Sequence, residues 1–258
     1  MNQCSKEIKE YAWGMAIGLQ AVDNIKTSRF LRKIATQHIE GLMTLDEGQK
    51  SLNQYYKENM NISEKRVEEA DKVSLHIVQN LLETSFSFST NEYISIHRQL
   101  FYGIYHHAGK IRDYNITKKE WVLNGDTLVY GDASILHETL ESEFLQEMNF
   151  QYENLSRDEI IHHLALFISC IWQFHVFGEG NTRTTAVFLV KYLNSLGQVI
   201  ENNTFAKYSW YFRNALVRAN YTNIPKGIFE TREYLELFLR NLLGEKNELH
   251  NRDMMVWL

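Results

Sequence analysis

The sequence predicts a mainly α-helical fold with one β-hairpin, and three observations support this. The 258 residues include a single proline and 13 glycines, so few positions interrupt a helix. Apolar residues recur at helical spacing along most of the chain, and three Ser/Thr-x-x-Glu sequences mark helix starts. β-prone residues flank an Asn-Gly turn in one segment, residues 112–131.

The N-terminal part, residues 1–84, is expected to contain helices only. Its apolar pattern fits a helix over 24–40 that ends at Gly41, because glycine commonly follows the last helical turn. The next helix opens at a capping box, Thr44–Glu47. A charged stretch, 63–72, is interpreted as the solvated face that leads into a third helix.

The C-terminal part, residues 85–258, is assigned as a second and larger domain. A capping box at Ser89–Glu92 starts its first helix, and the hairpin follows around Asn124-Gly125. The run 160–174, which follows a third box at Ser156–Glu159, is apolar on nearly every face and is predicted to be the central buried helix. Other helices are expected from residue 133 onward and over 181–196, 205–221 and 231–243.

Composition limits the classes of protein that the chain can represent. Apolar residues make up 44%, enough for a sizeable core, and the formal net charge is -5 without a long Lys/Arg run. This balance argues against nucleic acid or an anionic membrane as the main partner. The N-terminus lacks the apolar region of a signal peptide, so a cytoplasmic protein is expected. Cys4 and Cys170 lie far apart, and Cys170 is expected to be a buried small residue.

Residues 175–186 join two apolar helices and concentrate groups that suit phosphate chemistry. Free backbone N–H groups near Gly180 would stand at a helix N-terminus, where an anion is favoured. The helix dipole disfavours Arg183 in the first turn unless an anion lies beside it. Glu179 is a candidate Mg²⁺ ligand, and His175 is a candidate general base. Each residue alone has an ordinary structural explanation, but the combination favours a site.

The same segment resembles the signature of the Fic family, His-Pro-Phe-x-(Asp/Glu)-Gly-Asn-Gly-Arg-x-x-Arg. The shared positions are His175, Phe177, Glu179, Gly180, Asn181 and Arg183. The resemblance extends over about residues 90 to 243, where the hairpin is similar to the family's flap. It implies a protein adenylyltransferase that transfers AMP from ATP, with Mg²⁺, to a Ser, Thr or Tyr hydroxyl of a target protein, or of the chain itself.

The resemblance also implies a role for each residue. His175 would deprotonate the acceptor hydroxyl, Glu179 would hold Mg²⁺, and Arg183 would stabilise charge on the leaving phosphates. The phosphate cradle would comprise Gly180, Asn181 and Thr182. The flap would bind the target's backbone as an added strand, through Lys118, Lys119, Glu120, Trp121 and Val122.

Three positions depart from the signature. Val176 replaces the proline and is expected to change loop stiffness only. Thr182 replaces a glycine near the phosphates, at a position where a related branch of kinases has lysine. Ala186 replaces the second arginine, which holds the γ-phosphate in the family. Either γ-phosphate binding is weaker here, or another cation substitutes, with Arg213 and Arg218 on the later helix as the candidates.

These departures leave two alternatives open. The first is a Fic-type transferase of another nucleotide or of a phosphate. The second is a catalytically weak module that binds a nucleotide or a peptide, which would need neither the base at His175 nor the metal ligand at Glu179.

A short motif in the N-terminal part is similar to the inhibitory motif of the family, (Ser/Thr)-x-x-x-Glu-(Gly/Asn). It comprises Thr36, Glu40 and Gly41, and the following segment, 42–57, resembles a small antitoxin that accompanies some Fic toxins. The resemblance implies autoinhibition in which this helix packs beside the 175–183 loop and Glu40 points into the nucleotide site. Because Ala186 offers no partner, Glu40 would use Arg183 or a substitute cation, or would act mainly by its bulk.

Overall fold

The computed structural model describes residues 5–59, 65–198, 200 and 203–256. The α-helices are α1 Lys6–Gly18, α2 Arg29–Ile39, α3 Leu45–Glu58, α4 Lys65–Leu82, α5 Thr90–Phe101, α6 Leu136–Met148, α7 Arg157–Phe174, α8 Asn181–Ser195, α9 Thr204–Arg218 and α10 Glu233–Leu242. The 3₁₀ turns are η1 Leu19–Asp23, η3 Trp121–Leu123, η4 Ala133–Ile135, η5 Ile224–Lys226 and η6 Asn251–Met254. Strands β1 Thr117–Lys119 and β2 Thr127–Val129 form one antiparallel hairpin, so the predicted mainly α fold with a hairpin is confirmed.

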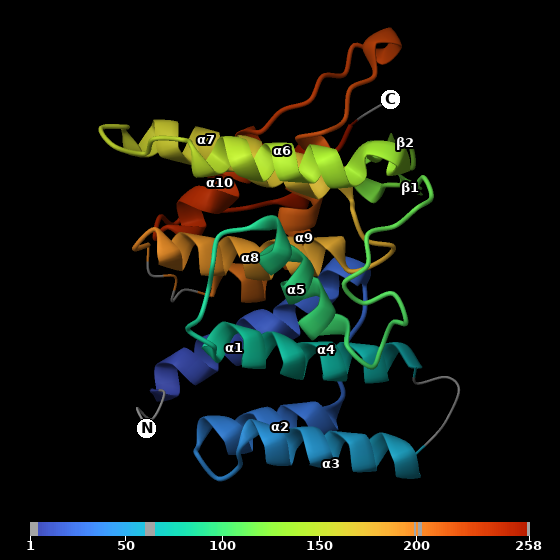
Figure 1. Ribbon diagram of the computed structural model, residues 1–258, viewed down its shortest axis with the longest axis vertical. Helices are drawn as coiled ribbons and strands as arrows, with labels where there is room; N and C mark the ends of the chain where they lie inside the picture. Colours follow the sequence, from blue (N-terminus) through green and yellow to red (C-terminus); the bar gives the residue numbers. More distant parts are fainter. Residues whose placement is uncertain (1–4, 60–64, 199, 201–202, 257–258) are drawn as a thin grey trace.

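The helices lie in layers that follow one another along the long axis of the molecule (Figure 1). Helices α2 and α3 form one end, α1 and α4 come next, α8 and α9 occupy the middle, and α6 and α7 lie near the other end. Helix α8 is central, because each of its residues from Asn181 to Leu193 is buried. The prediction that 160–174 is the central helix was wrong: α7 buries one face but leaves Leu166 41% exposed. Its apolar composition did not reveal that its outer side faces solvent.

Local signals placed most helix ends correctly. Reciprocal capping boxes are present at Thr44–Glu47 and Ser156–Glu159. At Ser89 the hydroxyl accepts the N–H of Glu92, which is half of the predicted box. Gly41 follows α2 with φ +75°, as the predicted helix stop requires.

The hairpin forms around the predicted turn, with Asn124 and Gly125 both at positive φ. Its register pairs Lys118 with Leu128. The β-prone run 121–123 is not a strand, however, but the 3₁₀ turn η3. Its side chains Val122 and Leu123 are fully buried, so packing onto the core overrides the local strand preference.

The N-terminal part shares its hydrophobic core with the rest of the chain. Trp13 and Leu19 are no more than 1% exposed and belong to one cluster with Phe101 and Phe212. Helix α1 packs against both α4 and α9, and the approach is close at Gly18. A Cβ at Gly18 would lie 2.6 Å from the Cα of Ala206. The boundary between residues 84 and 85 stays a prediction.

Helices α2 and α3 are attached to α4 through a buried carboxylate. Asp71, on α4, accepts hydrogen bonds from the N–H and hydroxyl of Ser28, at the N-terminus of α2. It also accepts the hydroxyl proton of Tyr56, on α3, at 2.7 Å. One side chain therefore fixes both helices of this pair.

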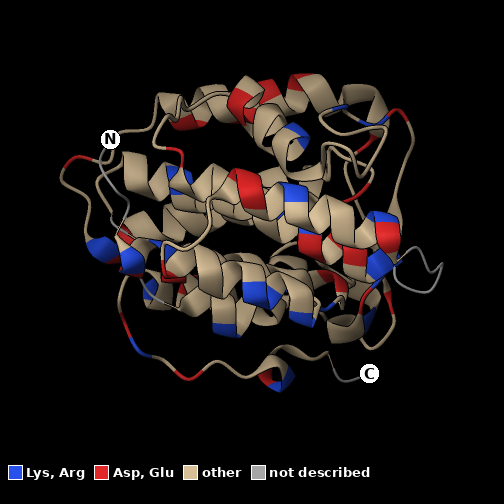
Figure 2. Cartoon of the chain, turned by 90° about the horizontal axis from the view of Figure 1, so that it is seen from below, with Lys and Arg blue, Asp and Glu red and all other residues tan. Residues whose placement is uncertain are grey.

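Acidic and basic residues are spread over the molecule, and the basic residues form no continuous length of ribbon (Figure 2). Within the residues that the structure describes, none of the helices combines the length and the apolar character needed to cross a membrane. Of the two cysteines, Cys4 lies outside the described residues, and Cys170 is partly rather than fully buried.

Candidate functional site

The loop between α7 and α8 begins at a residue with left-handed backbone. His175 ends α7 with φ 48° and ψ 51°. The guanidinium of Arg112, which is 5% exposed, donates to the carbonyls of Phe174, at 3.1 Å, and His175, at 2.7 Å. It also donates to the carbonyls of Tyr114 and Gly131. A buried cation thus satisfies the carbonyls at the end of α7, where the helix dipole favours positive charge.

The ring of His175 is held in one tautomer. Its Nδ1 lies 3.3 Å from the carbonyl oxygen of Trp172, and because a carbonyl only accepts, Nδ1 carries the hydrogen and Nε2 keeps a lone pair. Tyr130 stacks on the ring with 3.7 Å between centroids. Burial, assisted by the charges of Lys118 and Arg213, lowers the pKa of His175 well below its usual range. The imidazole is therefore neutral near pH 7 and can accept a proton.

Two side chains fold the loop that follows. Asn181 accepts the N–H of Phe177 at 3.0 Å and donates to its carbonyl at 2.8 Å. The Phe177 ring stacks on His97 with 3.7 Å between centroids. His97 accepts the N–H of Gly109 at Nδ1, so its Nε2–H donates to the carbonyl of Glu179 at 3.0 Å. The sequence did not predict this contact.

Gly180 opens α8 and cannot be replaced without strain. Its φ is +78°, and a Cβ would lie 2.3 Å from the ring of Phe101. No side chain caps the helix at this position. The N–H groups of the first turn of α8 therefore provide the anion-favouring helix end that the sequence predicts.

Glu179 is the one acidic residue of the loop, and its side chain is 50% exposed, 3.7 Å from the Nζ of Lys118. A single accessible carboxylate fits Mg²⁺ that takes its other ligands from substrate phosphates and water. Among the described residues, no group of three or more His, Cys, Asp or Glu side chains could hold a metal ion.

The two departures from the signature on α8 have clear structural settings. The hydroxyl of Thr182 accepts the indole N–H of Trp172 at 2.9 Å, so it ties α8 to α7. Ala186 is fully buried. Neither position can supply the cation that the family has on this helix.

Arg183 is buried and paired with residues of the N-terminal part. One terminal nitrogen lies 2.9 Å from Asp23 and 2.8 Å from Glu69, and the other donates to Gln20 at 3.1 Å. The guanidinium also lies over the ring of Phe101. Its Nε is buried without a hydrogen-bond partner among the described residues. Sequence reasoning missed these three partners, because they come from η1 and α4, far from the loop in sequence.

Glu40 does not point into the site. Its carboxylate is 48% exposed and pairs with Lys6 at 2.8 Å. Helix α2 packs against α1 and α3, and its buried face ends at His38. Because Glu40 follows that face by two residues, it falls on the outer side. The hydroxyl of Thr36 bonds within α2, and Gly41 ends the helix, so the predicted placement of this motif beside the 175–183 loop was wrong.

The flap residues fall into two groups. Lys119 and Trp121 are exposed, as contact with a target requires. Glu120 and Val122 are no more than 1% exposed, so the prediction that they contact the target directly was wrong. Glu120 instead forms a two-point ion pair with Arg213, with N–O distances of 2.5 and 2.9 Å.

Arg213, on α9, is held against the flap by Glu120, and its charge contributes to the lowered pKa of His175. Its role as a substitute cation stays a prediction. Arg218, the other candidate, donates to the carbonyl of Phe229, and two of its nitrogens are buried without a partner in the described part of the chain. Arg213 is therefore the better placed of the two.

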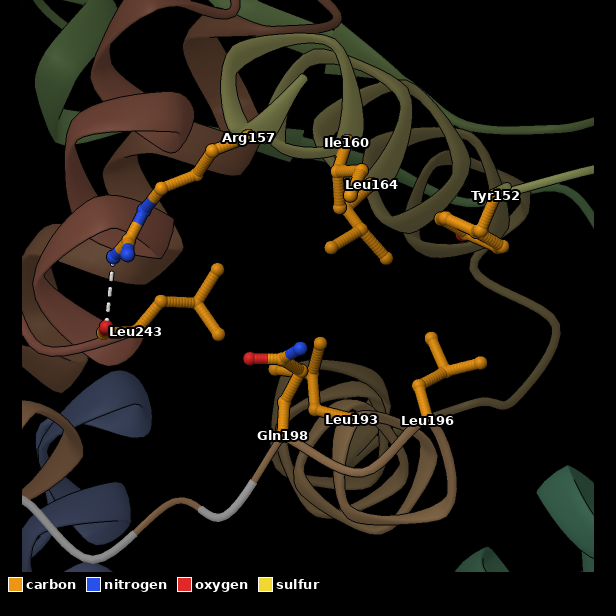
Figure 3. Close-up of a pocket in the computed structure, with 8 residues that line it drawn as sticks. All are labelled: Tyr152, Arg157, Ile160, Leu164, Leu193, Leu196, Gln198 and Leu243. Atoms are coloured by element: carbon orange, nitrogen blue, oxygen red, sulfur yellow. Dashed lines mark hydrogen bonds between the residues drawn. The ribbon is translucent and has the colours of Figure 1, made fainter. Parts of the chain in front are cut away.

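A separate cavity of about 350 Å³ lies away from this loop (Figure 3). Its walls come from the N-terminal turns of α7, through Arg157 and Ile160, and from the C-terminal end of α8, through Leu193 and Leu196. The 175–186 loop joins the opposite ends of these two helices. The cavity is therefore not part of the candidate site.

Residues 87–193 match the family model described as Fic/DOC family. No curated protein matches the chain. The matched span includes the flap, His97, Arg112 and the complete 175–186 segment, so the resemblance seen in the signature extends over the surrounding helices. Residues 87–193 are therefore a Fic/DOC family domain.

Proposed function

We propose that the protein transfers AMP from ATP to a Ser, Thr or Tyr hydroxyl of a target protein. The observation that carries this proposal is the state of His175. It is buried and neutral, with the hydrogen on Nδ1, in the loop that leads directly into the N-terminus of α8. A base and an anion-favouring helix end are therefore placed within six residues of one another.

The reaction would proceed by a single displacement. Nε2 of His175 accepts the proton of the acceptor hydroxyl, whose oxygen attacks the α-phosphorus of ATP, and the bond to pyrophosphate breaks. The N–H groups at the start of α8 and the charge of Arg183 or Arg213 stabilise the negative charge that develops. Glu179 would hold Mg²⁺, which supplies further neutralisation of the phosphates.

The flap is the proposed binding surface for the target. On β2, the carbonyl of Val129 already accepts a hydrogen bond from Gln173, which packs that strand against α7. The outer edge of β1, with Lys119 and Trp121 exposed beside it, is therefore the edge that we propose pairs with an extended target segment.

Intact mass spectrometry tests the function directly. The wild-type protein is incubated with Mg²⁺ and each nucleoside triphosphate in turn, beside His175→Ala and a matched control, His137→Ala, whose side chain is exposed. We expect a mass gain of one AMP with ATP in the wild type and in the control, and no gain in His175→Ala. A gain that persists in His175→Ala would exclude His175 as the base.

A second candidate keeps the fold and changes the transferred group. Ala186 is buried and uncharged, and Thr182 is engaged with Trp172, so neither position supplies a cation for a terminal phosphate. This favours testing donors other than ATP. A mass gain of another nucleoside monophosphate, or of a single phosphate, would support the second candidate. Binding of nucleotide without any mass gain would support a binding module.

A further inference from the structure

The flap presents a lysine to the candidate site. The Nζ atom of Lys118, on β1, lies 3.7 Å from a carboxylate oxygen of Glu179. Glu179 directly precedes Gly180, where the anion-favouring end of α8 begins. Burial lowers the pKa of His175 most, and among the nearby charges Lys118 contributes more to this shift than Arg213 does. The ammonium therefore lies beside the candidate metal ligand, and its charge acts on the candidate base.

The register of the hairpin explains why Lys118 faces the site. Lys118 pairs with Leu128, and residues directly opposite one another in a ladder point to the same face. Leu128 is 3% exposed, so this face is turned toward the core. Thr117 and Lys119 are exposed and lie on the other face, because side chains alternate along a strand. Of the two adjacent lysines on β1, Lys118 is thus the inward one.

The arginines around the site are firmly engaged, whereas Lys118 is only loosely paired. Arg112 donates to four backbone carbonyls, Arg183 pairs with two carboxylates, and Arg213 forms a two-point ion pair. The contact between Lys118 and Glu179 is long, and the Glu179 side chain is 50% exposed, so this pair contributes little to stability. Within the described part of the chain, Lys118 forms no other ion pair.

A lysine in this position suits a phosphate. Its ammonium is a compact charge on a flexible four-carbon side chain, so it can move from a carboxylate to a nearby phosphate oxygen. A cation is needed here, because Ala186 is fully buried and uncharged and the hydroxyl of Thr182 is engaged with Trp172. The flap can therefore supply the charge that these two positions of α8 lack.

We propose that Lys118 binds the terminal phosphates of the donor, in place of the cation that position 186 lacks. Without a donor, its ammonium pairs with Glu179. When a donor enters, the ammonium moves to a phosphate oxygen and leaves the carboxylate of Glu179 available as a ligand of Mg²⁺. The inference rests on the proposed function for the identity of the donor. It also separates the two lysines: Lys118 contacts the donor, and Lys119 remains available to the target.

The test measures binding rather than turnover. Inorganic pyrophosphate with Mg²⁺ is titrated calorimetrically into the full chain as wild type, Lys118→Met, Lys118→Arg and Lys119→Met. We expect Lys118→Met to bind pyrophosphate about tenfold or more weakly than the wild type, because one charge-assisted contact is lost. Lys118→Arg keeps the charge and should stay within about threefold of the wild type.

Lys119→Met is the matched control for pyrophosphate affinity. It removes the same charge from the neighbouring residue, on the opposite face of β1, and should match the wild type within about twofold. Equal weakening in Lys118→Met and Lys119→Met would reflect only the general charge of the flap and would overturn the proposal. Wild-type affinity in Lys118→Met, or no measurable binding by the wild type, would overturn it as well.

A second substitution protects the test against a folding defect. Thermal unfolding is recorded for each variant, and Lys118→Gln removes the charge with a polar side chain. If Lys118→Met does not fold, the same tenfold loss is required of Lys118→Gln, and its absence in a folded protein counts against the proposal.

Mass spectrometry of the same variants separates this inference from the proposed function. Weaker pyrophosphate binding by Lys118→Met, with no nucleotide transferred by the wild type, would retain Lys118 as a phosphate-binding residue and remove the transferase. Transfer at equal rates in wild type and Lys118→Met, with equal pyrophosphate affinity, would retain the transferase and remove Lys118 as a ligand of its donor.

Discussion

At the scale of single residues, the site depends on two buried histidines that stay neutral. His97 is fully buried, and burial lowers its pKa to about 3 despite its hydrogen bond to the Glu179 carbonyl. His175 shows the same direction for the same first cause. In His97 one nitrogen donates to the Glu179 carbonyl and the other accepts the N–H of Gly109, so protonation of His97 would break the contact with Gly109.

This gives the stability a defined pH dependence. The unfolded chain binds a proton at His97 below about pH 6.5, whereas the folded chain does so only near pH 3, so stability is full above pH 6.5 and falls as the pH drops. We expect His97→Gln to reduce the stability lost between pH 7 and pH 5 by about 2 kcal/mol. Urea unfolding at the two pH values measures this difference. His137→Gln, at an exposed position, should lose as much stability between the two pH values as the wild type does. If His97→Gln lost as much stability between pH 7 and pH 5 as the wild type does, the lowered pKa of His97 would be contradicted.

At the scale of elements, local sequence signals predicted turns and helix ends, whereas they did not predict which side chains pack together in the folded chain. The turn at Asn124-Gly125, the boxes at Thr44 and Ser156 and the stop at Gly41 were predicted because backbone geometry at those points is set by neighbouring residues. The family signature placed the candidate base, the candidate metal ligand and the helix end in one loop.

The errors concern which face of an element packs. Glu120 was predicted to contact a target and Glu40 to point into the site, but the first is buried against Arg213 and the second lies on the surface. The pairing of Arg183 with Asp23 and Glu69 joins segments 114 or more positions apart. No local pattern specifies such a contact, although an acidic residue at the end of a helix was a weak signal for Asp23.

The contact between α1 and α9 allows a matched pair of substitutions. Gly18→Ala would place a Cβ 2.6 Å from the backbone of Ala206, whereas Gly14→Ala would meet the Ala206 Cβ at an ordinary 3.7 Å. Both glycines lie in α1, where alanine is the better helix former. We expect Gly18→Ala to lose about 1–3 kcal/mol of unfolding free energy and Gly14→Ala to gain about 0.5–1 kcal/mol. Chemical denaturation measures both, and a stable Gly18→Ala would show that α1 can shift away from α9.

At the scale of the whole molecule, the N-terminal part behaves as a component of the fold rather than as an attached regulator. Trp13 of α1, Leu19 of η1 and Leu75 of α4 belong to the common core. Residues of η1 and α4 bind the guanidinium of Arg183. Removing them would expose apolar surface and leave a buried charge without its partners, and both effects destabilise strongly.

A shortened chain, residues 85–258, tests this view. We expect it to aggregate or to show no cooperative thermal transition, because its core lacks one wall and Arg183 lacks both carboxylates. Circular dichroism during heating and gel filtration measure the two outcomes, with the full chain as the reference. A cooperative transition in a monomeric 85–258 chain would establish the predicted boundary as a true domain boundary. In that case the N-terminal part could leave Arg183 as a unit, with both carboxylates that pair with its guanidinium.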